Sequence, residues 1–309
     1  MERVQVAVVQ AGSSIFDMSR TLAKVSNLCR EAAELGAKLV VFPEAFLGGY
    51  PKGANFGVRV GSRSIEGREE FRRYHDGAIG VPGEETAVVA ELALKYGINV
   101  VIGVVERDLG TLYCSVLFFG SDGKLKGKHR KIMPTAMERV IWGFGDGSTM
   151  PAIITDFGTI GAAICWENYM PLFRAAMYGK GVTLWCAPTV DDRESWQATM
   201  QHIALEGRCF VLSACQYMLR SDYPENYGPS EGQPTETVLI KGGSVIISPL
   251  GKVLAGPLRD MEGILVAELD LGEITRGKFD LDVVGHYSRP DIFSLTVNES
   301  PRRPVAFEE

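Results

Sequence analysis

The sequence predicts an α/β fold, in which short strands alternate with helices. Val4–Gln10 and Lys38–Phe42 read as apolar strands on either side of an amphipathic helix over residues 19–35, which together make a βαβ unit. The uncharged run Thr159–Ile164 has the composition of a strand that is covered on both faces, and a turn and a helix follow it. A hydrophobic content of 46% and a charged content of 23% are typical of a globular chain.

The same patterns predict the other elements in order. Helices are expected over 66–76, 83–96, 170–179 and 194–207, and strands over 98–106, 111–119, 182–187, 209–214, 242–248 and 264–270. Asn168 is expected to cap the helix that begins near Met170, and Asp191 or Asp192 the helix over 194–207. Residues 220–237 are polar and without periodicity, which indicates a loop.

The bulk properties exclude several classes of function. A net charge of −6 and a pI near 5.4 argue against nucleic acid as a main partner. No run of 18 apolar residues is present, so no membrane span is expected, and the N-terminus lacks a secretory pattern, which favours a cytoplasmic location. The six cysteines form no CxxC pair and the four histidines show no close ligand spacing, so neither disulfides, a metal nor a cofactor is expected.

Cys165 stands at the junction between the predicted strand over 159–164 and the turn that follows. Unpaired backbone N–H groups and the positive end of a helix are expected there, and both lower the pKa of a thiol and hold developing negative charge. The pattern therefore suggests a nucleophile. The alternative is a buried structural cysteine, which is the more common role for this residue type.

Two further strand ends carry residues that suit a nucleophile. Glu44 closes the strand over 38–42, where a general base would lie, although a solvated loop glutamate is the alternative. In the run 127–131, period-2 alternation places His129 and Lys131 on one face and Lys128 and Arg130 on the other, so that one pair can face a site while the other lies at an exposed strand edge. A cysteine, a carboxylate and a lysine supply a nucleophile, a base and a cationic stabiliser.

These three segments resemble the nitrilase branch of the carbon–nitrogen hydrolase superfamily, and the Cys-Trp-Glu step at 165–167 resembles nitrilases of the plant type and their bacterial relatives. The similarity runs from about residue 3 to 300 and includes 134–148, 186–189, 202–207 and 285–291. The resemblance implies a four-layer αββα sandwich, one domain over 1–300 with a short tail over 301–309, and a catalytic set of Glu44, Lys131 and Cys165. It also implies that Glu138 is a second active-site glutamate, whereas the residues alone favour a salt-bridged loop position. Homodimers that build larger oligomers, spirals or helical filaments are implied as well.

The function implied by the resemblance is hydrolysis of an aliphatic or arylaliphatic nitrile with water to a carboxylic acid and ammonia. A cysteine thioimidate and a thioester would be the intermediates, with some amide as a minor product. The alternatives are an amidase or carbamoylase of the same superfamily and a non-catalytic assembly protein. The glycine-rich loop over 48–61 is expected to wall the pocket. The expected substrate contacts are Tyr50, Phe56, Trp166, Trp185 and Thr189.

Overall fold

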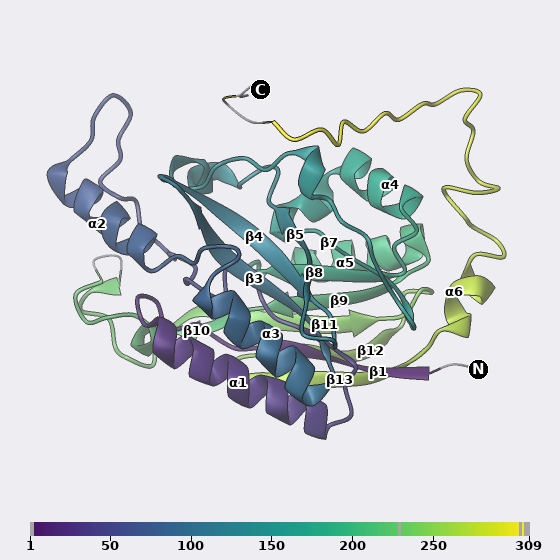
Figure 1. Cartoon of the computed structure of the whole chain (residues 1–309), viewed down its shortest axis with the longest axis horizontal. Coiled ribbons are helices and arrows are strands. Elements are labelled where there is room, and N and C mark those ends of the chain that lie inside the picture. Colours follow the sequence, from purple (N-terminus) through teal and green to yellow (C-terminus); the bar gives the residue numbers. More distant parts are fainter. Residues whose placement is uncertain (1–2, 228–229, 303–304, 306–309) are drawn as a thin grey trace.

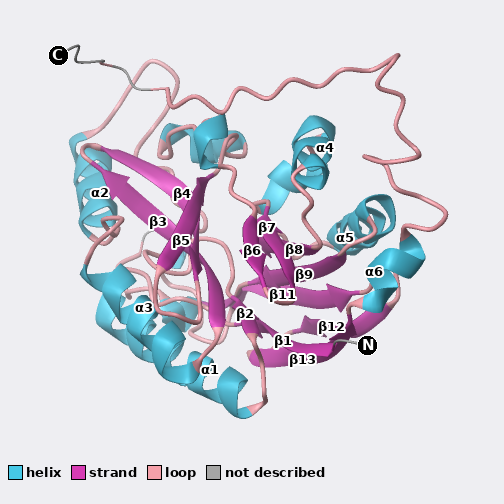
Figure 2. Cartoon of the chain, turned by 45° about the vertical axis from the view of Figure 1, so that its right-hand side comes forward, coloured by secondary structure: helices cyan, strands magenta, loops and turns pink. Residues whose placement is uncertain are grey.

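Two β-sheets pack face to face in the computed structural model, and helices cover their outer faces (Figures 1 and 2). The structure describes residues 3–227, 230–302 and 305. One hydrophobic layer lies between the sheets, a second lies under helices α1 and α3, and a third lies under α4 and α5. The predicted αββα sandwich is therefore confirmed.

The first sheet has six strands in the order β13-β1-β2-β3-β4-β5. Its central strands β1, β2 and β3 are parallel, and the outer pairs are antiparallel. The strands are β1 (Arg3–Gln10), β2 (Leu39–Val41), β3 (Asn99–Asp108), β4 (Thr111–Phe119), β5 (Leu125–Arg130) and β13 (Gly263–Asp270).

The second sheet has the order β10-β11-β9-β8-β7-β6, with β12 paired to β11. Its parallel strands β7, β8 and β9 form the centre. The strands are β6 (Ile153–Thr155), β7 (Gly158–Ala162), β8 (Leu184–Thr189), β9 (Phe210–Cys215), β10 (Tyr217–Leu219), β11 (Val238–Ile247) and β12 (Val253–Arg259). The strands β6, β10 and β12 were not predicted, because β6 and β10 have only three residues each and β12 contains a glycine and a proline, so none shows a clear strand pattern.

The helices lie on the outside of the sandwich (Figure 2). They are α1 (Met18–Glu34), α2 (Ile65–Asp76), α3 (Glu84–Tyr96), α4 (Pro171–Gly179), α5 (Glu194–Gly207) and α6 (Gly272–Gly277), with 3-10 turns η1 (Ala136–Val140), η2 (Gly147–Thr149), η3 (Cys165–Tyr169) and η4 (Arg220–Asp222). The predicted helices and strands are confirmed, with ends that shift by a few residues.

Strand β1 shows how the sequence sets the layers. Val6 and Val8 face the second sheet, whereas Ala7 and Val9 face the helices α1 and α3. Successive residues of a strand point to opposite faces, so a continuous apolar run is required where both faces are covered. Each fully buried valine contributes about 1.5 kcal/mol or more to folding.

The two predicted helix caps are wrong. Helix α4 begins after Met170 without a side-chain cap, because the Asn168 amide instead donates to the carbonyl oxygens of Ala163 and Cys165. The N-cap position of α5 is Arg193, and its backbone N–H donates to Asp191 Oδ1 in the preceding turn. In both cases the polar side chain stabilises the loop beside the helix, which local sequence does not distinguish from a cap.

The chain leaves the sandwich after α6. Residues 278–302 run over the outside without helix or strand, and most of them are exposed (Figure 1, yellow). Among the described residues, no helix is long and apolar enough to cross a bilayer, and no cluster of His, Cys, Asp and Glu could hold a metal ion.

Candidate active site

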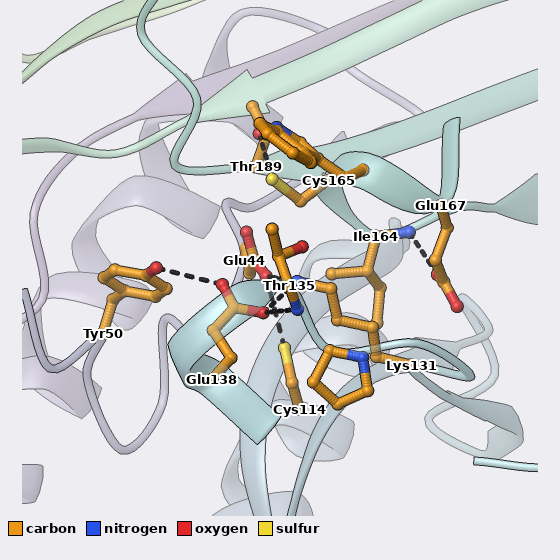
Figure 3. Close-up of polar contacts among 12 residues, drawn as sticks. Glu44, Tyr50, Cys114, Lys131, Thr135, Glu138, Ile164, Cys165, Glu167 and Thr189 are labelled. Carbon is orange, nitrogen blue, oxygen red and sulfur yellow. Dashed lines mark hydrogen bonds and ion pairs between the residues drawn. The ribbon is translucent and has the colours of Figure 1, made fainter. Parts of the chain in front are cut away.

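Three loops bring the predicted catalytic residues to one place between the two sheets. Glu44 follows β2, Lys131 follows β5, and Cys165 follows β7. Figure 3 shows that these side chains converge with Glu138 from η1. Since β7 belongs to the second sheet and the other two strands to the first, the site depends on how the sheets pack.

A tight turn directs the Glu44 side chain into the interior. Ala45 has a left-handed backbone with φ of 50°, and the turn packs against Gly103 of β3. A Cβ at Gly103 would come within 2.2 Å of the Pro43 carbonyl oxygen, so only glycine permits this approach. From the second sheet side, Gln216 donates its amide to the Glu44 carbonyl oxygen at 2.6 Å. The carboxylate is fully buried as a result.

One buried ammonium joins two carboxylates. Lys131 Nζ lies 2.6 Å from Glu44 Oε1 and 2.8 Å from Glu138 Oε2. Glu138 also accepts hydrogen bonds from the Thr135 backbone N–H at 2.7 Å and from the Tyr50 hydroxyl at 3.0 Å. The Lys131 side chain has no solvent exposure, so its orientation is fixed by these contacts.

Cys165 sits at a sharp turn between β7 and η3. Its backbone is left-handed, with φ of 48°, which is uncommon for a residue other than glycine and often marks a functional site. Thr189 at the end of β8 donates its hydroxyl to Cys165 Sγ at 3.2 Å. Within the described part of the chain, the buried Oε2 of Glu44 has no hydrogen-bond partner, which leaves it available to accept a proton.

The electrostatics keep the resting thiol neutral. Burial raises the pKa of Cys165 well above its usual value, and the nearby Glu44 carboxylate raises it further. This corrects the expectation that a helix N-terminus lowers the thiol pKa, because burial outweighs that effect. Burial also raises the pKa of Glu44 to about 7, although Lys131 acts in the opposite direction.

The ammonium stays charged in this environment. Burial opposes the charge of Lys131, but Glu44 and its other anionic neighbours outweigh burial and raise the pKa of Lys131. At neutral pH the site therefore contains three groups: a protonated thiol, a carboxyl group that can exchange a proton, and an ammonium with a fixed positive charge. That set can activate a sulfur nucleophile without a metal ion.

A cavity of about 210 Å³ opens onto the cysteine. Its walls include Tyr50, Glu138, Cys165, Trp166 and Arg193. A second cavity of about 410 Å³ shares Tyr50, Lys52 and Glu138 with the first and reaches Phe56. The loop over 48–61 therefore lines the space beside the catalytic set, as its position after Glu44 suggests.

The predicted substrate contacts divide into two groups. Tyr50, Phe56 and Trp166 line the two cavities, and Thr189 contacts the cysteine sulfur. Trp185 requires a correction, because it is fully buried in the layer under α4 and α5, and its indole N–H donates to Asn168. Strand β8 is covered on both faces, so apolar composition did not reveal which face Trp185 occupies.

The alternation along β5 has a different consequence from the one expected. Lys131 faces the site and His129 is buried on the same side. Lys128 and Arg130 do not form an exposed edge but pair with the buried Glu106, at 2.5 Å and 2.6 Å respectively.

Several residues near the site were not predicted. Cys114 on β4 places its sulfur 3.6 Å from Glu44 Oε1, and a cysteine inside a strand carries no sequence signal of that contact. Asp191, one of the two predicted cap residues of α5, accepts a hydrogen bond from the Trp166 indole at 2.8 Å and pairs with Arg193. Glu167 is buried two residues after Cys165. Its position in the sequence, just after a candidate nucleophile, could have marked this carboxylate as part of the site.

The chain is similar to known proteins over nearly its whole length. The chain is 58% identical to an aliphatic nitrilase of Sinorhizobium fredii (strain HH103) over 99% of both chains. It is 59% identical to a bifunctional nitrilase/nitrile hydratase of Lupinus angustifolius, over 98% of this chain and 88% of that protein. A carbon-nitrogen hydrolase from Helicobacter pylori G27 has a similar fold, with a TM-score of 0.72 at 22% identity over 94% of this chain and 97% of that one. The family profile of carbon-nitrogen hydrolases matches residues 5–279, and the chain belongs to the carbon-nitrogen hydrolase family.

Proposed function

We propose that this protein is a nitrilase that converts an organic nitrile and water into a carboxylic acid and ammonia. The observation that carries the proposal is the buried thiol of Cys165 beside a carboxyl group, Glu44, whose pKa lies at about 7, and a fixed ammonium. Two relatives that are named nitrilases, at 58% and 59% identity, support nitriles as the substrates of this carbon–nitrogen chemistry.

In the first half-reaction, Glu44 accepts the thiol proton as Cys165 Sγ attacks the nitrile carbon. The proton passes to the nitrile nitrogen, and a thioimidate forms. A water molecule, deprotonated by Glu44, then adds to the same carbon to give a tetrahedral species. Lys131 and the Trp166 backbone N–H stabilise the negative charge that develops there.

In the second half-reaction, the tetrahedral species breaks its carbon–nitrogen bond. Glu44 passes the proton taken from water, and then the hydroxyl proton of the tetrahedral species, to the nitrogen, so that ammonia leaves and a thioester remains. A second water molecule attacks the thioester, releases the acid and restores the thiol. Glu138 holds the Lys131 ammonium through a 2.8 Å contact and thereby keeps the charge aligned in both halves.

An amide forms when the tetrahedral species expels the thiolate instead of ammonia. The ratio of acid to amide depends on which leaving group is better stabilised, and a change of about 1.4 kcal/mol alters it tenfold. We expect some amide, in line with the relative from Lupinus angustifolius that is named a bifunctional nitrilase/nitrile hydratase.

The substrate we propose is an aliphatic or arylaliphatic nitrile. The cavity at Cys165 measures about 210 Å³, and the aromatic side chains Tyr50, Phe56 and Trp166 stand on the walls of this cavity and its neighbour. A small polar nitrile group can enter at the cysteine while an apolar substituent contacts these rings.

The test is ammonia release from a panel of nitriles and their corresponding amides, with wild type, Cys165→Ala and Cys29→Ala. Cys29 is an equally buried cysteine in the layer under α1 and serves as the matched control. Release from a nitrile by wild type and Cys29→Ala, with none from Cys165→Ala, is expected. Release from amides only would move the protein to the amidases, and turnover by Cys165→Ala would contradict the role of the nucleophile.

We also propose that the protein acts in the cytoplasm as a homodimer that builds larger oligomers or helical filaments, with a single domain over 1–300 and a tail over 301–309. The exposed apolar residues Tyr169 at the end of η3 and Leu172 in α4, 40% and 68% accessible, support self-association. Sedimentation and negative-stain microscopy of the purified protein test this, and a monomer at micromolar concentration would contradict it.

A further inference from the structure

The carboxylate of Glu167 connects the backbone beside two catalytic residues. Its Oε1 accepts a hydrogen bond at 2.7 Å from the backbone N–H of Ile132, which directly follows Lys131. Its Oε2 accepts one at 2.7 Å from the backbone N–H of Ile164, which directly precedes Cys165 (Figure 3). One buried side chain thus joins the loop after β5 of the first sheet to the loop after β7 of the second.

His129 is the counter-ion of this carboxylate. Its Nε2 lies 2.8 Å from Glu167 Oε2, and its Nδ1 lies 2.7 Å from the carbonyl oxygen of Thr149. A carbonyl oxygen only accepts hydrogen bonds, so Nδ1 carries a proton, and the carboxylate requires a donor at Nε2 as well. The histidine is therefore an imidazolium, and its buried charge offsets the buried charge of Glu167.

The two hydrogen bonds of Glu167 to Ile132 and Ile164, here called the Glu167 bridge, lie beside a strained stretch of backbone. Cys165 has a left-handed backbone with φ of 48°, a conformation that persists only when the surroundings hold it. Glu167 closes the turn around Cys165 from within the same segment and ties that turn to Ile132, in the loop that follows β5. No other side chain among the described residues is recorded as bonding both Ile132 and Ile164 through their backbone N–H groups.

We propose that Glu167, with His129 as its counter-ion, is a positioning residue that sets the distance between the Cys165 thiol and the Lys131 ammonium. It does not touch the reacting atoms. This inference rests on the proposed nitrile hydrolysis for its kinetic readout. A shift of about 1 Å at a catalytic group can lower the rate of a reaction about 100-fold, so the bridge should affect turnover more than substrate binding.

The main variant is Glu167→Gln. A glutamine side chain accepts hydrogen bonds only at its oxygen, so one of the two backbone N–H groups would face an NH₂ group instead. A second variant, Glu167→Asp, keeps the charge for His129 but is one methylene too short to reach both loops. It protects the test against a folding failure of the first variant.

The matched control is Glu106→Gln. Glu106 is equally buried and is bonded by Lys128, Arg130 and Ser115, on the opposite face of β5 from Lys131. Its loss removes a buried ion pair of the same sheet but no link to the Cys165 turn. Melting temperature, kcat, KM and the amide fraction of the product are measured for all four proteins.

Glu167→Gln and Glu167→Asp are expected to lower kcat by about 10- to 100-fold, with KM within about threefold and a larger amide fraction. Glu106→Gln is expected to lose melting temperature but to keep kcat within about threefold of wild type. Normal kcat in both Glu167 variants, or an equal loss of kcat in Glu106→Gln, would overturn the inference.

A nitrile-free readout separates this inference from the proposed function. Iodoacetamide alkylation of Cys165, followed by peptide mass spectrometry, requires the thiolate but no nitrile. It is expected to slow by about threefold or more in Glu167→Gln and to stay unchanged in Glu106→Gln. If wild type releases no ammonia, the proposed function fails, while equal alkylation rates in all proteins would refute the positioning role by itself.

Discussion

Replacing Lys131 with methionine removes the ammonium that lies between Glu44 and Glu138. Methionine keeps a long unbranched side chain, so the change deletes the ammonium rather than the volume. The two carboxylates would then lie close together in a buried space without a counter-ion. Loss of one partner of a buried ion pair costs about 3–5 kcal/mol of folding stability, and protonation of Glu44 would reduce that cost.

The effect on turnover has two sources. Loss of a donor that stabilises transition-state charge lowers kcat about 100- to 1,000-fold. In addition, Lys131 acts to lower the pKa of Glu44, so its removal raises that pKa above about 7 and leaves less carboxylate to act as the base. Both effects reduce turnover at neutral pH.

The pH profile gives the sign of the second effect. The carboxylate form of Glu44 is the active one, so activity of the wild type should fall as pH drops through about 7. In Lys131→Met the same acid limb should move to higher pH, because the carboxyl group holds its proton more strongly. Any remaining activity of Lys131→Met should therefore still increase at pH values where the activity of the wild type has already reached its plateau.

The assay is ammonia release from pH 5.5 to 9.5, together with urea denaturation of the same proteins. Lys128→Met is the matched control, because Lys128 lies on the opposite face of β5 and pairs with Glu106. A Lys131→Met enzyme with kcat within about tenfold of wild type and an unchanged acid limb would refute the role of this ammonium.

Two further changes test the surroundings of the cysteine. Thr189→Val removes the hydroxyl that donates to Cys165 Sγ at 3.2 Å. We expect kcat to fall by up to about tenfold, which corresponds to the usual free energy of one hydrogen bond. Unchanged steady-state kinetics would exclude that contact from the mechanism. Trp185→Phe removes the indole N–H that donates to Asn168, so we expect a lower melting temperature with KM unchanged across a panel of nitriles. A change in nitrile preference would return Trp185 to the substrate site.

The candidate catalytic set could be predicted largely from local patterns. Glu44 and Cys165 come shortly after apolar strands and Lys131 directly after the basic strand β5, and a strand end in an α/β fold is where functional side chains gather. Glu138 was different, because η1 has no periodic pattern and only the family resemblance pointed to that residue. In the structure, the 3-10 turn η1 brings Glu138 to Lys131, and so short a turn has no hydrophobic periodicity by which it could be predicted.

The charges of the site could not be predicted in the same way. A thiol at a strand–helix junction suggests a lowered pKa, yet burial and Glu44 raise the pKa of Cys165. Burial depends on both sheets, and Glu44 lies far from Cys165 along the chain. Neither quantity is visible in the residues around a single cysteine.

The packing of strand β8 shows the same limit. Its run from Leu184 to Thr189 is buried throughout, so alternation does not separate the inner face from the outer one. Trp185 faces the helices and Cys186 faces the other sheet, and only the completed sandwich distinguishes them.

Amino-acid patterns alone were sufficient for the α/β class, most element positions, the position of three candidate catalytic residues at strand ends and, through resemblance, the layered architecture. These features arise from interactions within one segment or between neighbouring segments. The tertiary structure decided the protonation of the thiol, the partners of Glu138 and the bridge made by Glu167, because each depends on groups that meet only after distant parts of the chain have come together.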